Sequence, residues 1–216
     1  MKVEFESPRP SGAIVLEGRL HSDHAGEKAP GVVLCHPHPA GGGEMGVSLI
    51  RRLADELSAR GFLALRFNFG GVGLSGGAFT DGEEEPWDVG AAVTYLKSMP
   101  EVDAERLHLA GWSFGSWMAL MSLAQGLQVE SCVAVAPPLI AYDWSTHAPR
   151  IATSPAHRFY IVGEKDQFCA VADLREFASR ISSRDAESVA VVPGADHFLF
   201  GREPEVIGMV AERLGV

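Results

Sequence analysis

The sequence has no apolar run long enough to cross a membrane, and its first residues lack the apolar core of a secretory signal. A membrane-spanning helix needs roughly 18 or more consecutive apolar residues, and no stretch of the 216 residues approaches that length. The opening segment, residues 1–12, reads MKVEFESPRPSG and has no apolar h-region. We therefore expect a cytoplasmic protein with no membrane span.

The chain is also poor in cysteine and in clustered basic residues. Its three cysteines, an odd number, have neither paired nor metal-type spacing, which argues against a disulfide framework. Lys and Arg number 18 against 28 Asp and Glu, so the formal net charge is −10. Because nucleic-acid binding needs a basic face, we expect no nucleic-acid partner, and nothing in the sequence requires a metal or another cofactor.

The sequence instead alternates apolar β-type runs with amphipathic helical runs. Helical spacing of apolar residues is found in 47–61, 87–99, 114–126, 171–181 and 203–214. The β-type runs are 13–20, 31–36, 62–69, 106–111, 131–138, 158–166 and 188–197. This alternation predicts an α/β fold in one domain, residues 1–216, with a mostly parallel sheet covered on both faces. The irregular stretch 139–157 is too short for a cap domain, and whether it partly covers a site stays open.

Two serines, Ser75 and Ser113, lie in a Gly-x-Ser-x-Gly pattern. The pattern carries chemistry where a strand turns sharply into a helix and exposes the serine hydroxyl above the sheet. Ser113 has a strand-like run before it and an amphipathic helical run after it. Ser75 is followed by turn-forming and acidic residues with no helix for several positions. We therefore expect Ser113 to be the nucleophile and Ser75 to be a chance match.

A serine hydroxyl is a poor nucleophile unless a base removes its proton and an acid fixes the tautomer of that base. Asp166 and His197 each follow the end of a later β-type run, which places them at the sheet edge expected for Ser113. The remaining histidines fit packed or solvated positions. Asp143, in the irregular stretch, and Asp196, beside His197, remain alternative acids.

Acyl transfer also needs two backbone N–H groups that stabilise the developing oxyanion. One is expected from Phe114, the residue after the nucleophile. The other is expected from the loop HPHPAGGG after the run 31–35. Pro37 and Pro39 have no N–H to donate, so His38 is the expected donor, with Ala40 second.

Taken together, these segments resemble the small capless α/β-hydrolases related to dienelactone hydrolase and serine esterases. The resemblance runs from about Val32 to the end and rests on VVLCHPHPAGGGEMG, LRFNFGGVGLSGG, LAGWSFGS, VGEKD and GADHFLFG. It implies an α/β-hydrolase fold with no cap domain and the chain order Ser113, Asp166, His197. Many relatives carry a basic residue at the position of Gly70, a departure that changes the charge beside the site.

The expected function is a serine hydrolase that cleaves a small-molecule carboxylic ester or thioester through an acyl-enzyme. Four residues near the predicted site, Trp112, Trp117, Phe198 and Met45, are expected to give it apolar walls, although either tryptophan can equally belong to the core. The acidic segment 81–88 is expected near the mouth, where it disfavours anionic acyl donors. The absent cap predicts little preference on the alcohol side. The physiological substrate and the oligomeric state stay open.

Other functions fit the sequence less well. Residues 71–76 match the dinucleotide pattern G-x-G-x-x-G but open no helix. His36 and His38 in HPHP lack further ligands at metal spacing, and His36 is better read as a structural residue of the loop. A serine peptidase or amidase of the same fold, and a catalytically silent domain that binds a ligand or a protein, remain alternatives because fold does not imply function.

Overall fold

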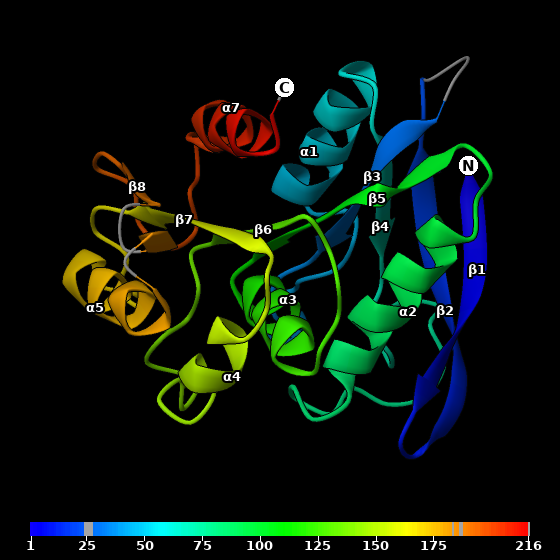
Figure 1. Ribbon diagram of the computed structural model, residues 1–216, viewed down its shortest axis with the longest axis horizontal. Coiled ribbons are helices and arrows are strands. Elements are labelled where there is room, and N and C mark those ends of the chain that lie inside the picture. Colours follow the sequence, from blue (N-terminus) through cyan, green and yellow to red (C-terminus); the bar gives the residue numbers. More distant parts are fainter. Residues whose placement is uncertain (24–27, 183, 186–187, 216) are drawn as a thin grey trace.

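The computed structural model describes residues 1–23, 28–182, 184–185 and 188–215. An eight-stranded sheet with helices on both faces forms the molecule (Figure 1). The strands are β1 (Lys2–Arg9), β2 (Gly12–His21), β3 (Ala29–Cys35), β4 (Leu63–Phe67), β5 (Val102–Trp112), β6 (Ser131–Val135), β7 (His157–Gly163) and β8 (Val189–Val192). The helices are η1 (Pro39–Gly41, 3-10), α1 (Ser48–Ala59), α2 (Glu85–Lys97), α3 (Phe114–Ala124), α4 (Ala148–Ala152), α5 (Val171–Ile181) and α7 (Glu203–Arg213).

The sheet is mixed, with a parallel majority, as the strand–helix alternation predicts. The strand order is β1-β2-β4-β3-β5-β6-β7-β8. Only the pairs β1–β2 and β2–β4 are antiparallel among the described strands, and all other neighbours are parallel. Every residue of β3 and of β6 is buried, because helices cover both faces of the central strands. The predicted α/β class is confirmed.

Two apolar layers separate the helices from the sheet. In β3, Val32 and Leu34 point into the layer shared with α1 and α7, whereas Val33 and Cys35 point into the layer shared with α2, α3 and α5. Figure 1 shows the same division, with α1 and α7 on one side of the sheet and α2, α3 and α5 on the other. Because successive side chains along a strand point to opposite faces, one strand contributes residues to both layers. Among the described residues, no helix has the length and apolar character needed to cross a bilayer.

The parallel strands bring the loops of interest to one edge of the sheet. Because β3, β5, β7 and β8 run in the same direction, their carboxyl ends meet there. His38 follows β3, Ser113 follows β5, Asp166 follows β7 and His197 follows β8. Strand direction alone therefore gathers four of the candidate residues.

The sequence-based prediction does not include strand β1, although the strand has an alternating pattern of burial. Its residues alternate between exposed and buried, with Val3, Phe5, Ser7 and Arg9 facing inward. An inward arginine breaks the apolar alternation that normally marks a strand. The short helix α4 was also missed, inside the stretch predicted as irregular.

Arg9 is buried beneath the acidic segment that leads into α2. Its Nε donates to Asp88 Oδ1 at 2.8 Å and its Nη1 to the Ala78 carbonyl at 2.7 Å, while Nη2 pairs with Asp88 Oδ2. Glu85 Oε1 lies 3.4 Å from the same Nη2. The guanidinium therefore neutralises two carboxylates whose side chains have no solvent exposure.

The same arginine accounts for the glycine at position 70. A Cβ at Gly70 would overlap the Arg9 guanidinium, and the Gly70 N–H donates to Asp88 Oδ2 at 2.9 Å. A basic group from β1, the Arg9 guanidinium, therefore lies directly against Gly70. Its charge is used in a buried ion pair and not at the mouth of the site.

Arg9→Met should lower the free energy of unfolding by about 3–5 kcal/mol, because it leaves the Asp88 carboxylate buried without its partner. The matched control is Arg60→Met, which breaks an exposed pair with Glu56 one helical turn away and should cost under about 1 kcal/mol. Urea denaturation of the two variants measures the difference. Equal losses would contradict the role given to Arg9.

Candidate active site

Ser113 occupies a strained turn between β5 and α3. Its backbone has φ 53° and ψ −119°, a conformation that a side-chain-bearing residue rarely adopts. The turn depends on close backbone approach on both sides. A Cβ at Gly115 would lie 2.5 Å from the Cys35 carbonyl carbon, and a Cβ at Gly111 would lie 2.6 Å from the Ser116 nitrogen. Both glycines of the Gly-x-Ser-x-Gly pattern are therefore required by space.

A continuous hydrogen-bonded chain joins Ser113, His197 and Asp166. Ser113 Oγ lies 2.8 Å from His197 Nε2, and His197 Nδ1 lies 3.0 Å from each Asp166 oxygen. A carboxylate only accepts hydrogen bonds, so the Nδ1 proton faces Asp166 and the Nε2 lone pair faces the serine hydroxyl. All three side chains are buried. The arrangement is able to move a proton from the hydroxyl to the imidazole.

Asp166 is fixed by the loop in which it lies. Its Oδ1 accepts the N–H groups of Phe168 at 2.8 Å and Cys169 at 3.0 Å. The two alternative acids are engaged elsewhere: Asp143 accepts from the Ser145 hydroxyl, and Asp196 accepts from the Phe198 N–H. Neither makes a hydrogen bond with the His197 ring among the described residues.

In the loop after β3, the described hydrogen bonds leave the His38 N–H without an acceptor. Ala40 donates to His38 Nδ1 at 3.1 Å, Gly41 and Gly43 donate to the His38 carbonyl, and Gly42 donates to that of Pro39. Within the described chain, no acceptor pairs with the His38 N–H or with the Phe114 N–H at the start of α3. Both residues line the pocket at Ser113, and an unpaired backbone N–H is a donor available to an oxygen bound there.

The His38 side chain is itself held in place. Since its Nδ1 accepts from Ala40, its Nε2 carries the proton and donates to Asp81 Oδ1 at 2.9 Å. Tyr142 donates to the same oxygen at 3.3 Å. Burial and the neighbouring Asp81 carboxylate raise the pKa of the Tyr142 hydroxyl, so it remains a donor. Asp81 takes a left-handed φ of 53° to reach both groups.

A pocket of about 360 Å³ opens at Ser113. It is lined by Pro37, His38, Gly41, Trp112, Ser113, Phe114, Pro138, Ala141, Tyr142, Phe168, His197 and Phe198. No Lys, Arg, Asp or Glu is among these lining residues. The stretch 139–157 contributes one wall through Ala141 and Tyr142, which answers whether it borders the site.

Two of the four residues predicted to line the site lie elsewhere. Trp117 is turned into the core, where its ring packs on Trp144 and Tyr142, because the first turn of α3 directs it beneath the elbow. Met45 is buried in the loop before α1, where its N–H donates to Asn68. Trp112 and Phe198 do line the pocket, and the Trp112 indole N–H also donates to the His197 carbonyl at 3.3 Å.

The acidic segment 81–88 also differs from its predicted position at the mouth. Glu85 and Asp88 are buried against Arg9, and Glu84 accepts from Ser11. Asp81 does approach the site, through its hydrogen bonds to His38 and Tyr142. Glu85 and Asp88 turn away from the site because they pair with the buried Arg9 guanidinium.

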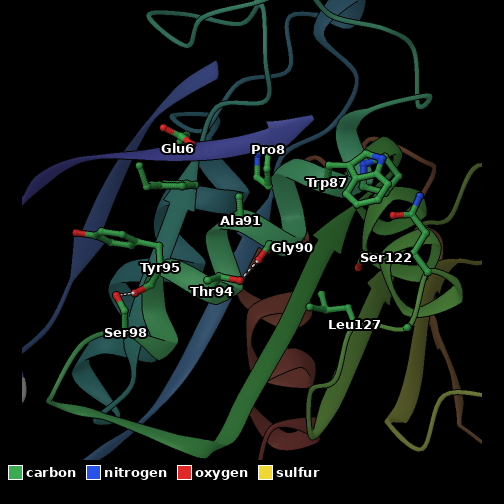
Figure 2. Close-up of a pocket in the computed structure, with 14 residues that line it drawn as sticks. Glu6, Pro8, Trp87, Gly90, Ala91, Thr94, Tyr95, Ser98, Ser122 and Leu127 are labelled. Carbon is green, nitrogen blue, oxygen red and sulfur yellow. Dashed lines mark hydrogen bonds between the residues drawn. The ribbon is translucent and has the colours of Figure 1, made fainter. Parts of the chain in front are cut away.

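A larger cavity, of about 580 Å³, lies between β1, α2 and the end of α3 (Figure 2). It is lined by four hydroxyls, one of which is the phenol of Tyr95. The other three donate to backbone carbonyls of their own helices: Thr94 to Gly90, Ser98 to Tyr95 and Ser122 to Ala119. No histidine or cysteine lines it. None of its hydroxyls is hydrogen-bonded to a histidine or carboxylate base among the described residues, so the Ser113 pocket is the candidate active site.

Comparison with known proteins agrees with this geometry. Residues 30–205 match the family model described as "Alpha/beta hydrolase domain". The chain belongs to the alpha/beta hydrolase family. It is 30% identical over 191 residues to an uncharacterized protein of Rickettsia prowazekii, covering 84% of this chain and 78% of that protein.

Two further relatives bear on the activity of this alpha/beta hydrolase. It is 31% identical over 153 residues to a thiohydrolase of Arthrinium phaeospermum, covering 69% of this chain and 47% of that protein. A solved alpha-beta serine hydrolase homologue of Coxiella burnetii superposes with a TM-score of 0.81 at 28% identity, covering 99% of this chain and 97% of that one.

Ser75, the second match to the serine pattern, has a structural position in this fold. Its hydroxyl donates to the Asn68 carbonyl at 2.7 Å and accepts the Glu17 N–H at 3.1 Å. It makes no contact with the His197 ring among the described hydrogen bonds. Sequence reasoning missed Tyr142 and Phe168, because no motif marks them and long-range packing alone brings them to the pocket.

In its neutral form, His36 connects the loop after β3 to the residues that follow β4. Its Nδ1 donates to the Pro37 carbonyl at 2.7 Å, and its Nε2 accepts the Phe69 N–H at 3.2 Å. Burial lowers the pKa of this imidazole from 6.5 to about 4. This confirms the prediction that His36 is a structural residue of the loop.

The lowered pKa of His36 predicts a pH-dependent stability. Between about pH 6.5 and 4 the unfolded chain binds a proton at this residue that the folded chain excludes, so stability falls as the pH falls through this window. The full effect is roughly 3 kcal/mol, from 1.36 kcal/mol per pKa unit. His36→Gln should flatten the slope of unfolding free energy against pH in urea titrations, whereas His157→Gln, at an exposed position, should retain it. Parallel curves for wild type and His36→Gln would contradict the assignment.

Proposed function

We propose that this protein is a serine hydrolase that cleaves a carboxylic ester or thioester through an acyl-enzyme intermediate. The observation that carries the proposal is the hydrogen-bonded chain from Ser113 Oγ through His197 to Asp166, at 2.8 and 3.0 Å. The unpaired N–H groups of His38 and Phe114 beside the same hydroxyl support it. Together these groups supply the nucleophile, the base, the acid that orients the base, and two oxyanion donors.

The proposed reaction begins when the Ser113 oxygen attacks the substrate carbonyl and passes its proton to His197 Nε2. The carbonyl oxygen becomes an oxyanion that accepts from the His38 and Phe114 N–H groups. His197 then gives the proton to the leaving alcohol or thiol, and Ser113 is acylated. A water molecule, deprotonated by His197, attacks the acyl-enzyme and releases the acid. Asp166 accepts the Nδ1–H of His197 and stabilises the imidazolium.

The pocket favours a neutral acyl group of short to medium length. Its walls combine aromatic rings and prolines, and no charged Lys, Arg, Asp or Glu side chain lines it. An anionic acyl group would be desolvated there without a counter-charge. The relative that acts as a thiohydrolase supports thioesters as the alternative to oxygen esters. The proposed partner is accordingly a small-molecule substrate.

Ser113→Ala should abolish labelling by a fluorophosphonate and hydrolysis of short-chain esters, because it removes the attacking oxygen. Ser75→Ala is the matched control: the same atom is lost from a serine in the same Gly-x-Ser-x-Gly pattern, and both signals should persist. Labelling followed by intact-mass spectrometry measures the outcome. A domain that only binds a ligand would leave the wild type unlabelled, and loss of labelling in Ser75→Ala alone would reverse the assignment of the nucleophile.

Asp166→Asn should lower kcat by about 10³- to 10⁴-fold, as loss of the same role does in serine proteases. The amide oxygen would retain the N–H groups of Phe168 and Cys169, which turns the amide NH₂ toward His197 and forces the proton onto Nε2. The variant should fold, which circular dichroism checks. Asp196→Asn is the control and should keep near wild-type turnover. A folded and active Asp166→Asn would move the role to Asp143 or Asp196.

A further inference from the structure

Two phenylalanines beside the candidate base are exposed to solvent. Phe200 is 77% exposed and Phe198 is 44% exposed. Their rings stack on each other at 5.8 Å with an interplanar angle of 11°. Exposed aromatic clusters of this kind mark places where a protein contacts something apolar.

The backbone between them is strained in a way that keeps both rings outward. Leu199 has a left-handed φ of 56°, which is an outlier for a bulky residue. Its own side chain is 1% exposed and anchored in the core shared with α1 and α7. Because Leu199 points inward, its two neighbours project away from the core. Strain of this kind persists where surrounding structure enforces it, and it clusters at functional sites.

The exposed pair continues an apolar surface that starts at the base itself. The Phe168 ring lies 4.7 Å and the Phe198 ring 5.8 Å from the His197 ring, and both line the pocket. Ile140, 68% exposed, donates its backbone N–H to the Phe168 carbonyl. We call these four residues, Ile140, Phe168, Phe198 and Phe200, the His197 rim.

We propose that the His197 rim binds the leaving group of the substrate, and that this leaving group is an apolar alcohol or thiol with an aryl or long alkyl chain. The inference rests on the proposed function. A general acid must come within hydrogen-bond reach of the leaving atom. The side chains packed around the His197 ring therefore border the leaving group, whereas the His38, Asp81 and Tyr142 side lies by the oxyanion donors.

Without a cap, the alcohol side of the site is open, and the sequence predicts little preference among alcohols there. That side nevertheless carries the exposed aromatic rings of Phe198 and Phe200. Apolar area removed from water contributes in proportion to its size, and one buried methylene corresponds to about four-fold in binding at most. We therefore expect kcat/KM to rise with the chain length of the leaving group.

The test is a series of acetate esters with constant acyl group and alcohols from ethanol to hexanol, whose intrinsic reactivities differ little. For the wild type, kcat/KM should rise by about two- to four-fold per methylene. Phe200→Ser should flatten this dependence, and Phe200→Leu should restore much of it because an apolar side chain returns. The control is Leu74→Ser, which removes a leucine that is 84% exposed and lies outside the pocket; it should keep the wild-type slope.

Several other outcomes would overturn the inference. A flat wild-type series, or a Phe200→Ser slope equal to that of the wild type, would overturn the inference and leave the proposed function standing, provided that hydrolysis depends on Ser113. Absence of any Ser113-dependent hydrolysis would overturn both. Light scattering at the assay concentration reports whether the rim joins two copies of the chain: a dimer that Phe200→Ser dissociates, with the slope unchanged, would assign the rim to self-association and overturn the inference.

Discussion

The tight contact between the start of α3 and the end of β3 is the constraint on which the site depends. The backbone at Gly115 lies against the Cys35 and His36 carbonyl groups, a separation that no side chain at position 115 would permit. This contact holds the turn at Ser113 in its left-handed conformation and sets the Phe114 N–H beside the loop that carries His38. Because Gly115 has no side chain, the ends of β3 and β5 approach closely enough to border one pocket.

Backbone strain in this protein is concentrated around that pocket. The described residues with positive φ other than glycine are Asp81, Ser113, Ala136 and Leu199. Asp81 binds the His38 ring, Leu199 follows His197 by two residues, and Ala136 follows β6 at the same edge of the sheet. Each costs of order 1–3 kcal/mol, which the two apolar layers of the sheet offset. No other non-glycine residue in the described part of the chain has a positive φ.

The sequence predicts the parts of the fold and site that depend on local pattern and strand direction. Alternating runs indicate the parallel sheet, and strand ends indicate that Ser113, Asp166 and His197 lie at one edge, where the structure joins them by hydrogen bonds. The pattern does not indicate which way a side chain turns once it reaches that edge. Trp117 and Met45 turn inward, and Tyr142 arrives from a stretch without a motif. These depend on packing between residues distant in sequence.

Arg9 shows how far from the pocket such packing begins. It lies on a strand missed in the sequence, yet it pairs with Glu85, whose carboxylate also accepts the N–H groups of Thr80 and Gly82. Those bonds hold the turn on either side of Asp81, and Asp81 in turn fixes the His38 ring. The buried ion pair on β1 is thus connected to the His38 ring through the backbone of residues 80–82.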